Sequence, residues 1–421
     1  MAGLDLELSS FLLPHSLMAN SGGIIVSYFG VHQAYQIALA AQELGALDAF
    51  YCSLFDAPGK WGSLVGNIVG RSALLNRQCP GLNPQAVLEI PGPFIYELIR
   101  EKLNKTSGMP GWFRTAISFD HKVASQLKQF ESRVIIGMET CSRDSFRVAT
   151  GKGMLKVLDC PQAHPVFLTR LLTEAADDLG LPPPPSFDTP EIADRKIEEF
   201  ATADILLMIT ELERRSFVEA GLPEDRLVVV PYGIDTTLWV PPKKQKPVQP
   251  NIPLRVLFVG TIGFRKGIPY LMRALEKCGS LTSLTLVGPN SKETDQFLHA
   301  VRPAANYVGT KTKAALREIY WESDVLVLPS LVDTYGLVAM EAMACGLPAI
   351  VTENCGVPVP DPAWRVPVMD SDAIAQRLEY YAKDRDALNR DGQVAQQFAR
   401  QFTPERYREQ IKNLLRRLLE L

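Results

Sequence analysis

Short apolar runs alternate with helical patterns along almost the whole chain, and this alternation limits the possible folds more than any other feature. GIIVSYF at 23–29 is followed by AYQIALAAQEL at 34–44, and LRVLFVG at 254–260 is followed by IPYLMRALEKC at 268–278. Apolar strands separated by helices are typical of parallel sheets that are covered by crossover helices. The sequence therefore predicts an α/β fold of the doubly wound, Rossmann-like kind.

A proline- and lysine-rich break, VPPKKQKPVQPNIP at 240–253, interrupts the alternation. Its prolines cannot continue a helix or sit in a central strand, so we predict a linker there. The chain then divides into two α/β domains, residues 1–239 and residues 254–402.

Residues 403–421 form a predicted amphipathic helix, with Thr403 as its cap and Pro404 as its first residue. Five basic and three acidic residues between 405 and 421 give the polar face a mildly basic character. Docking on a domain is the favoured interpretation of this helix, and contact with a membrane surface is the alternative.

The charge balance limits the classes of partner. A formal net charge of −3 argues against nonspecific binding to nucleic acid, which needs a strongly basic face. The start MAGLDLELSS is acidic, unlike a signal peptide, and no apolar run approaches the ~18 residues that span a membrane. We expect a cytoplasmic protein, with peripheral contact at the inner face of a membrane left open.

Cysteines and histidines show no pattern of metal ligation. The seven cysteines are scattered without a C-x-x-C pair, so we expect buried reduced thiols. The strings DSD at 370–372 and DRD at 384–386 precede helical patterns, and helix N-capping explains them better than metal binding. We predict no metal site and no cofactor.

Two acids frame a helix start in the second domain. The segment DTYGLVAME begins with Asp333, has a predicted helix from Leu337 onward, and ends at Glu341. Tyr335, just before this helix, is assigned to donor binding. The first free amides of such a helix, at Gly336, Leu337 and Val338, suit a phosphate group. Carboxylates suit sugar hydroxyls instead, so the segment predicts a diphosphate held between two sugars. The alternative is that both acids are ordinary helix-start and surface residues.

A basic loop in the same predicted sheet favours the functional interpretation. Arg265 and Lys266 follow the strand that ends at Gly260, in the stretch FVGTIGFRKG. Two cations beyond a strand end are placed to neutralise a diphosphate leaving group.

Taken together, GTIGFRKG, VVVPYGID and DTYGLVAMEAMACGLPAIVTENCG resemble the retaining GT-B glycosyltransferases of group 1, the glycosyltransferase family 4 type within the glycogen-synthase-like superfamily. The resemblance implies two Rossmann-like domains that face each other across a cleft, with the last helix returning to the first domain. It implies that Glu341 binds the ribose, that Asp333 contacts the transferred sugar, and that Arg265 and Lys266 bind the diphosphate.

The sequence departs from the family pattern in two places. The first acid is Asp333 where members usually have Glu, and Thr261 stands where many members have Arg. Arg265 is expected to supply the charge that Thr261 lacks.

In the first domain, the resemblance implies a donor-phosphate contact at Gly30. His32, at the predicted helix start that follows, is a candidate acceptor contact. The resemblance also implies that His164, in VLDCPQAHPVF, lies beside the reactive sugar, where a neutral imidazole can hydrogen-bond a hydroxyl. The alternative for each histidine is a capping or surface role.

The expected partners are a nucleotide-sugar donor and a sugar, lipid-linked or other small hydroxyl acceptor, with no nucleic acid. The expected activity is sugar transfer with retention, without a metal, in the synthesis of a polysaccharide, glycolipid or glycoconjugate. Two alternatives stay open: a nucleotide-sugar-binding protein without turnover, and another GT-B-like enzyme such as a nucleotide-sugar epimerase. The sequence does not name the base, the sugar or the acceptor.

Overall fold

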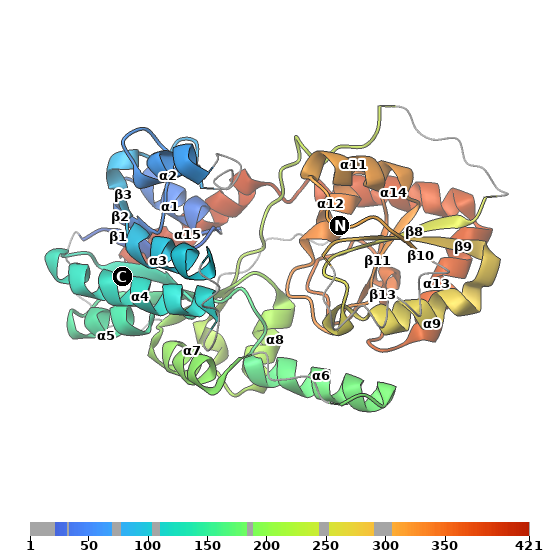
Figure 1. The fold of residues 1–421 in the computed structure, drawn as a ribbon, viewed down its shortest axis with the longest axis horizontal. Coiled ribbons are helices and arrows are strands. Elements are labelled where there is room, and N and C mark those ends of the chain that lie inside the picture. The colour runs from blue at the N-terminus through green and yellow to red at the C-terminus, as the bar shows by residue number, and fades with distance from the viewer. Residues whose placement is uncertain are drawn as a thin grey trace.

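The structure is a computed structural model that describes residues 22–31, 33–69, 77–102, 110–182, 188–243, 252–289 and 305–420. Two α/β lobes lie side by side, each built around its own parallel sheet (Figure 1). This arrangement confirms the predicted fold class.

The first sheet has the strand order β3-β2-β1-β4-β5-β6-β7, and every pairing in it is parallel. Its strands are β1 (Ile24–Ser27), β2 (Leu47–Cys52), β3 (Val87–Glu89), β4 (Val134–Met138), β5 (Leu155–Asp159), β6 (Ile205–Met208) and β7 (Leu227–Val229). The helices between them are α1 (Ala34–Glu43), α2 (Trp61–Val69), α3 (Pro91–Lys102), α4 (Gly111–Gln126), α5 (Arg143–Gly151), α6 (Pro165–Leu179), α7 (Pro190–Thr202) and α8 (Glu211–Glu219).

The second sheet repeats this topology, with the order β10-β9-β8-β11-β12-β13 and parallel pairing throughout. Its strands are β8 (Leu254–Val259), β9 (Thr282–Val287), β10 (Ala305–Tyr307), β11 (Val325–Leu328), β12 (Ala349–Thr352) and β13 (Arg365–Val366). Its helices are α9 (Ile268–Cys278), α11 (Lys313–Glu322), α12 (Leu337–Ala344), α13 (Ser371–Lys383) and α14 (Arg385–Ala399).

The direction of strand addition reverses between β1 and β4 in the first sheet and between β8 and β11 in the second. In doubly wound sheets, ligands bind beyond the carboxyl ends of the strands at such a reversal. The basic loop follows β8 and the segment with both acids follows β11, so the fold brings the two sequence motifs to one reversal point.

Local signals set several helix starts as predicted. Asp370 and Asp384 cap α13 and α14 by accepting hydrogen bonds from the amides of Ala373 and Ala387, both at 2.8 Å. These caps confirm the capping interpretation of the two acidic strings. All seven cysteines are buried and free, as expected.

The last helix, α15 (Pro404–Glu420), leaves the second domain and packs on α1 of the first (Figure 1). Its apolar face joins the first-domain core through Tyr407, Ile411, Leu414, Leu415 and Leu418. Arg408 and Lys412 pair with Glu43 at 2.9 and 3.1 Å. The docking interpretation of this helix is therefore confirmed.

Helix α6 forms a second bridge between the domains. It belongs to the first domain by sequence, but its apolar side chains join the hydrophobic core of the second. These side chains are Phe167, Leu168, Leu171, Leu172 and Ala175. At its carboxyl end Asp178 accepts a hydrogen bond from the hydroxyl of Tyr270 on α9, at 2.9 Å. Two elements far apart in the chain, α6 and α15, thus hold the domains together.

Candidate active site

The basic loop is pressed against the end of strand β11. Arg265 and Lys266 lie in a short 3-10 turn (Phe264–Lys266), and Gly267 follows with a φ of 70°. A Cβ atom at Gly267 would lie 1.7 Å from the carbonyl oxygen of Pro329, so only glycine allows this approach. The carbonyl of Arg265 accepts a hydrogen bond from the amide of Leu331 at 2.9 Å. This contact fixes the loop beside the segment that carries Asp333.

Asp333 and Lys266 form an ion pair across this junction. The Lys266 ammonium donates to Oδ2 of Asp333, and the two side chains are only 16% and 14% exposed. The other oxygen, Oδ1, accepts from the amide of Gly336 at 3.2 Å. Asp333 therefore takes one of the amides that the sequence had assigned to phosphate, because its carboxylate lies within reach of the turn. A carboxylate has about four lone-pair sites, so both oxygens of Asp333 can still accept a ligand hydroxyl.

The turn before α12 requires a glycine. Gly336 is the N-cap residue with a φ of 67°, and α12 begins at Leu337, as the sequence predicted. A Cβ atom at Gly336 would lie 2.7 Å from the Sγ atom of Cys355. The amino end of α12, with its positive partial charge, and the loop with Arg265 and Lys266 line the same cavity.

Glu341 is the single charged residue of α12, whose sequence is LVAMEAMA. Ala339, Met340, Ala342 and Met343 around it are fully buried. Oε2 of Glu341 accepts a hydrogen bond from the hydroxyl of Tyr320 on α11 at 3.2 Å. Burial raises the pKa of Glu341 to about 7, against the opposing effects of Tyr320 and the charge of Lys313. Burying a carboxyl group on an apolar helix costs free energy, so its presence there marks Glu341 as a candidate functional residue.

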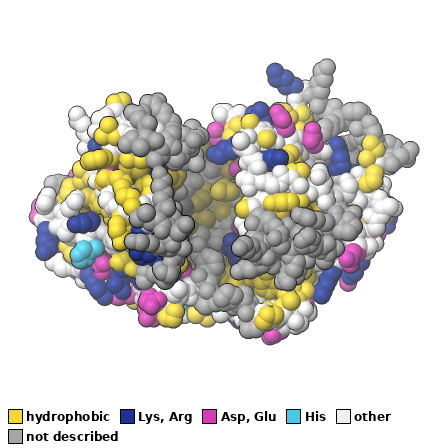
Figure 2. Space-filling model, in the orientation of Figure 1, with side chains coloured by type: hydrophobic (Ala, Val, Ile, Leu, Met, Phe, Trp, Pro, Cys, Tyr) yellow, Lys and Arg dark blue, Asp and Glu magenta, His cyan; other side chains and the backbone are white. Residues whose placement is uncertain are grey.

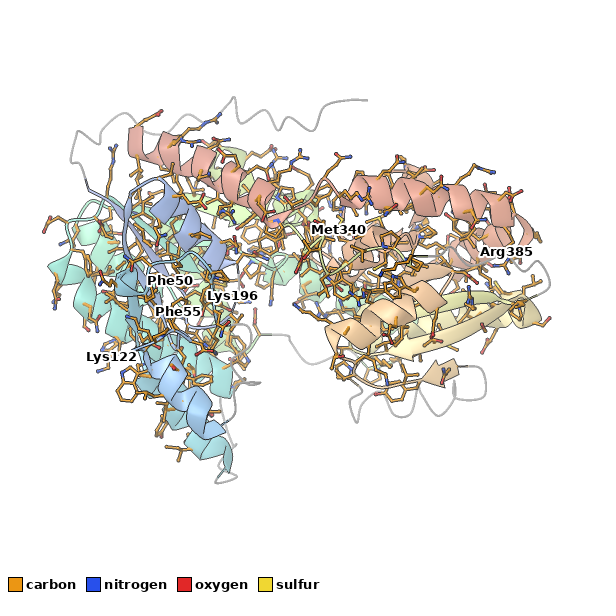
Figure 3. All side chains as sticks on the ribbon, turned by 90° about the horizontal axis from the view of Figure 1, so that it is seen from above. Phe50, Phe55, Lys122, Lys196, Met340 and Arg385 are labelled. Atoms are coloured by element: carbon orange, nitrogen blue, oxygen red, sulfur yellow. The ribbon has the colours of Figure 1, made fainter. Side chains whose placement is uncertain are left out.

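A cavity of about 380 Å³ lies where the two domains meet. The second domain contributes Arg265, Lys266, Asp333 and the start of α12, together with Val259 and Gly260 at the end of β8. The first domain contributes Pro161, Gln162, Ala163, Leu168, Ile209 and Tyr232. Figure 2 shows the hollow between the two lobes, with hydrophobic side chains in its depth. Figure 3 shows α12, marked by Met340, on the side of the second domain that faces the first.

Tyr335 contacts the first domain directly. Its side chain is 4% exposed and belongs to the first-domain core cluster. Its hydroxyl donates to the carbonyl of Tyr232, and the two rings lie 5.7 Å apart. Sequence reasoning assigned Tyr335 to the donor only. The structure shows that Tyr335 lines the cavity and also joins the two domains.

His164 does not line this cavity, although its neighbours Pro161, Gln162 and Ala163 do. It is the N-cap residue of α6, where Nδ1 accepts from the amide of Val166 at 3.4 Å. Its ring packs against Phe200 and Phe217 with centroid distances of 5.5 and 5.2 Å. Burial lowers the pKa of His164 to about 4, and the charge of Lys196 adds to this shift. In this structure His164 therefore has the capping role that was the alternative interpretation of its sequence position.

The remaining first-domain candidates receive less support from the geometry. Gly30 follows β1 and packs closely on Tyr28, whose hydroxyl would lie 2.8 Å from an added Cβ atom. Gly30 does not line the cavity. His32 lies outside the described residues.

A group of buried ion pairs lies beyond the carboxyl end of β4. Lys196, labelled in Figure 3, pairs with Glu139 at 2.6 Å and with Asp188 at 2.9 Å. All three side chains are buried, and burial raises the pKa of Glu139 despite the opposing charge of Lys196. This group therefore pairs buried charges inside the first domain and does not line the cavity.

Sequence reasoning did not name Gln162 and Tyr232, which line the cavity, or Tyr320, which contacts Glu341. Gln162 and Tyr232 had a usable signal, because each lies in a short loop just after a predicted strand end. Tyr320 had none, because it lies inside a helical pattern far from both motifs.

Within the described ranges, no group of three or more His, Cys, Asp or Glu side chains is placed to hold a metal ion. In the same ranges, no helix has the length and apolar character needed to cross a membrane.

Comparison with known proteins agrees with this geometry. Residues 253–384, most of the second domain, match the family model described as glycosyl transferases group 1. The D-inositol 3-phosphate glycosyltransferase of Corynebacterium aurimucosum is 28% identical over 256 residues, which cover 54% of this chain and 61% of that protein. Matches to the first curated relatives span between 28% and 61% of their lengths.

Solved structures show the same fold over nearly the whole chain. Sucrose-phosphate synthase from Thermosynechococcus elongatus superposes with a TM-score of 0.65 at 19% identity, covering 94% of this chain and 99% of the other. Anabaena Alr3699/HepE in complex with UDP-glucose gives a TM-score of 0.58 at 14% identity, covering 93% and 99%.

The fold and the cavity between its domains define a GT-B protein. Its second domain is similar to the group 1 glycosyl transferases, whose family model matches residues 253–384.

Proposed function

We propose that the protein is a retaining glycosyltransferase that moves a sugar from a nucleotide-diphosphate sugar to a hydroxyl group. The observation that carries this proposal is the composition of the interdomain cavity. Two cations, a helix amino end and the carboxylate of Asp333 converge on one space that both domains enclose. Closure of the two domains over a bound donor would exclude water from this space and favour transfer to an acceptor over hydrolysis.

The diphosphate fits between the basic loop and α12. Arg265 and Lys266 supply positive charge from one side, and the amides of Leu337 and Val338 at the start of α12 face it from the other. In many enzymes, preorganised groups that stabilise the charge developing in the transition state provide most of the rate enhancement. Because these groups neutralise the leaving phosphate, we propose that transfer needs no metal ion.

The transferred sugar would lie next to Asp333, which accepts a hydrogen bond from one of its hydroxyls. Lys266 holds this carboxylate in place through the ion pair. In the reaction, the bond between the sugar C1 and the β-phosphate oxygen breaks, and C1 bonds to the acceptor oxygen on the same face. The acceptor proton passes to the departing phosphate, so the step needs no further reactant.

The ribose is assigned to Glu341, whose carboxylate accepts hydroxyl hydrogen bonds as in the family that the sequence resembles. UDP-glucose is the first donor to test, because Alr3699/HepE binds it in a structure with this fold. The acceptor would enter from the first-domain side, beside Gln162 and Tyr232. A sugar, lipid-linked or other small hydroxyl compound in glycoconjugate synthesis is proposed, with the protein acting in the cytoplasm or at a membrane surface.

One observation favours a second candidate, a nucleotide-sugar-binding protein without turnover. His164, which the resemblance placed beside the reactive sugar, instead caps α6 between two aromatic rings. An imidazole held in this cap would not contact the transferred sugar, so the turnover that it was expected to support would be lost.

The test incubates the protein with UDP-, GDP-, ADP- and TDP-sugars and a panel of hydroxyl acceptors, with and without EDTA. We expect free nucleotide and a new linkage of the donor's anomeric configuration, formed equally in both conditions. Loss of product in EDTA would overturn the metal-independent step, and an inverted linkage would overturn retention. Donor binding without any product would favour the second candidate.

A further inference from the structure

We infer that Tyr320 is a positioning residue, which orients Glu341 for the ribose. It also connects this carboxylate, through Trp239, to the interdomain crossover, the segment at 238–240 that leads from the first domain to the second. The inference rests on the proposed function, because it assumes that Glu341 contacts a nucleotide. Nothing in the sequence motifs marks Tyr320, which lies on α11, 21 residues before Glu341.

The hydroxyl of Tyr320 lies between two acceptors on α12. It is 3.2 Å from Oε2 of Glu341 and 3.2 Å from the carbonyl oxygen of Val338, in the first turn of the same helix. One hydroxyl thus ties the carboxylate to the helix end that is assigned to the diphosphate. A free glutamate side chain has three rotatable bonds, so a fixed partner removes much of the entropy lost on binding.

The tyrosine is itself held rigidly by the crossover. Its ring is 1% exposed and meets Trp239 edge-on, at a centroid distance of 5.6 Å and an angle of 69°. Trp239 is 4% exposed and lies in the segment that leads from the first domain to the second. The crossover backbone is fixed to α11, because Trp321 donates to the carbonyl of Val240 at 2.7 Å and Arg317 to that of Leu238 at 3.2 Å. A shift of the crossover would therefore be transmitted to the Glu341 side chain.

The same hydroxyl suits both protonation states of Glu341. Tyr320 donates to the ionised carboxylate, whereas a protonated Glu341 can donate to Tyr320, which then donates to Val338. Burial and the neighbouring Glu341 raise the pKa of Tyr320 well above its ordinary value, so it stays a neutral donor. The other titratable groups that act on Glu341 are Lys313, which favours its ionised form, and the thiol of Cys345.

The experiment compares the wild type with Tyr320→Phe, which keeps the ring against Trp239 and removes only the hydroxyl. Binding of UDP, GDP and ADP and of their 2′-deoxy forms is measured by calorimetry between pH 5.5 and 8.5. For the diphosphate that binds best, we expect the wild type to prefer the ribose form by about tenfold. In Tyr320→Phe this preference should fall to about twofold, and the midpoint of the pH profile should rise, because Glu341 loses a hydrogen bond to its ionised form.

The matched control is Tyr381→Phe. Tyr381 is also fully buried in the second domain, and its hydroxyl donates to Asp391 at 2.6 Å, away from the cavity. The Tyr381→Phe protein should have a lower melting temperature, as Tyr320→Phe should. It should keep the wild-type preference for ribose and the wild-type midpoint of the pH profile. Trp239→Leu, which leaves Tyr320 intact but loosens its ring, should lose part of the preference.

A Tyr320→Phe protein that keeps both the ribose preference and the pH midpoint would overturn the inference while leaving the proposed function standing. If the wild type binds none of the diphosphates, the proposed function itself is overturned, and the inference with it. A measurement without ligand is also possible, because ¹³C NMR of labelled glutamate, assigned with Glu341→Gln, follows the titration of Glu341 directly. An unchanged titration of Glu341 in Tyr320→Phe would contradict the inference even without a nucleotide.

Discussion

Asp333 has a different place in the site from the one that its position in the motif implies. It pairs with Lys266 and also accepts the amide of Gly336, so it links the basic loop to the start of α12. This double contact accounts for a carboxylate beside the region proposed to bind phosphate, where an unpaired negative charge would repel the ligand. Asp is one methylene shorter than the Glu usual in the family, and the short side chain lies within reach of both partners.

Replacing Asp333 by Asn should reduce turnover more than donor affinity. The amide keeps the shape of the side chain but cannot accept a charge-assisted hydrogen bond, which is about twice as strong as a neutral one. We expect kcat to fall by about 10- to 100-fold, with a donor KM within about threefold of the wild type. Steady-state kinetics with the best donor measures both values. Asp372→Asn, at an exposed ion pair with Lys277, is the surface control, and a fully active Asp333→Asn or Asp333→Ala would refute the assignment.

Glu341 should make the stability of the second domain depend on pH. Its folded pKa of about 7 lies above the value of an unfolded glutamate, so the folded state binds more protons between about pH 4.5 and 7. The contribution of Glu341 to stability is therefore present at low pH and is lost as the pH rises through 7. Glu341→Gln has no carboxyl group to ionise, so it does not show this loss. Between pH 4.5 and pH 8, the free energy of unfolding of Glu341→Gln should therefore rise by roughly 1–3 kcal/mol relative to that of the wild type.

Urea denaturation followed by tryptophan fluorescence at the two pH values measures this change. The exposed Glu353→Gln serves as the control for removing one negative charge. A difference between Glu341→Gln and the wild type that does not change with pH would contradict the raised pKa.

Helix α12 shows how one backbone conformation sets up a site. Its amino end meets the basic loop only because Gly336 adopts a positive φ and packs against Cys355. The helix is otherwise apolar and buried, so its position is determined by the core on which it packs. The site is thus built on a rigid element, with the loops brought to it.

Gly336→Ala should destabilise the second domain and abolish donor binding. The positive φ alone costs an alanine about 1 kcal/mol, and the close approach to Cys355 adds about 1–3 kcal/mol of packing strain. Gly45→Ala separates these two effects, because Gly45 also has a positive φ, of 69°, but nothing lies within 4 Å of its added Cβ atom. We expect a clearly lower melting temperature for Gly336→Ala than for Gly45→Ala. Equal melting temperatures would show that Cys355 moves aside.

At the scale of the whole molecule, several side-chain contacts join the two domains around the cavity. Tyr335 bonds to Tyr232 beside the site, while Asp178 on α6 bonds to Tyr270 on the second domain. Arg215 adds a hydrogen bond to Asn354 at 2.7 Å. Tyr335 also packs its ring against Tyr232, and Asp178 also lies 3.8 Å from Arg273, so each hydrogen bond is only part of its contact.

Tyr335→Phe should weaken closure without unfolding either domain. The change keeps the ring packing but leaves the carbonyl of Tyr232 without its hydroxyl donor, at a cost of about 1–3 kcal/mol. We expect a larger radius of gyration by small-angle scattering and a higher ratio of donor hydrolysis to transfer, because water then enters the cavity. Tyr96→Phe, at an exposed tyrosine of the first domain, is the control. An unchanged scattering curve and hydrolysis ratio would show that this bond does not hold the domains together.

The sequence by itself determined the features that depend on near neighbours. The alternation of strands and helices, the glycine at the start of α12 and the caps at Asp370, Asp384 and Thr403 follow from local periodicity and from side chains that reach only a few residues. The two motifs of the second domain could be placed at one sheet edge because parallel strands share that edge.

The tertiary structure alone decided which of these groups meet. The Lys266–Asp333 pair joins residues 67 positions apart, and the bond from Tyr335 to Tyr232 spans 103 positions. Such contacts depend on strand order, on loop packing and on how two domains approach each other, and no local pattern encodes these. For the same reason His164, which follows a strand end as expected, packs against Phe200 and Phe217 and does not line the cavity.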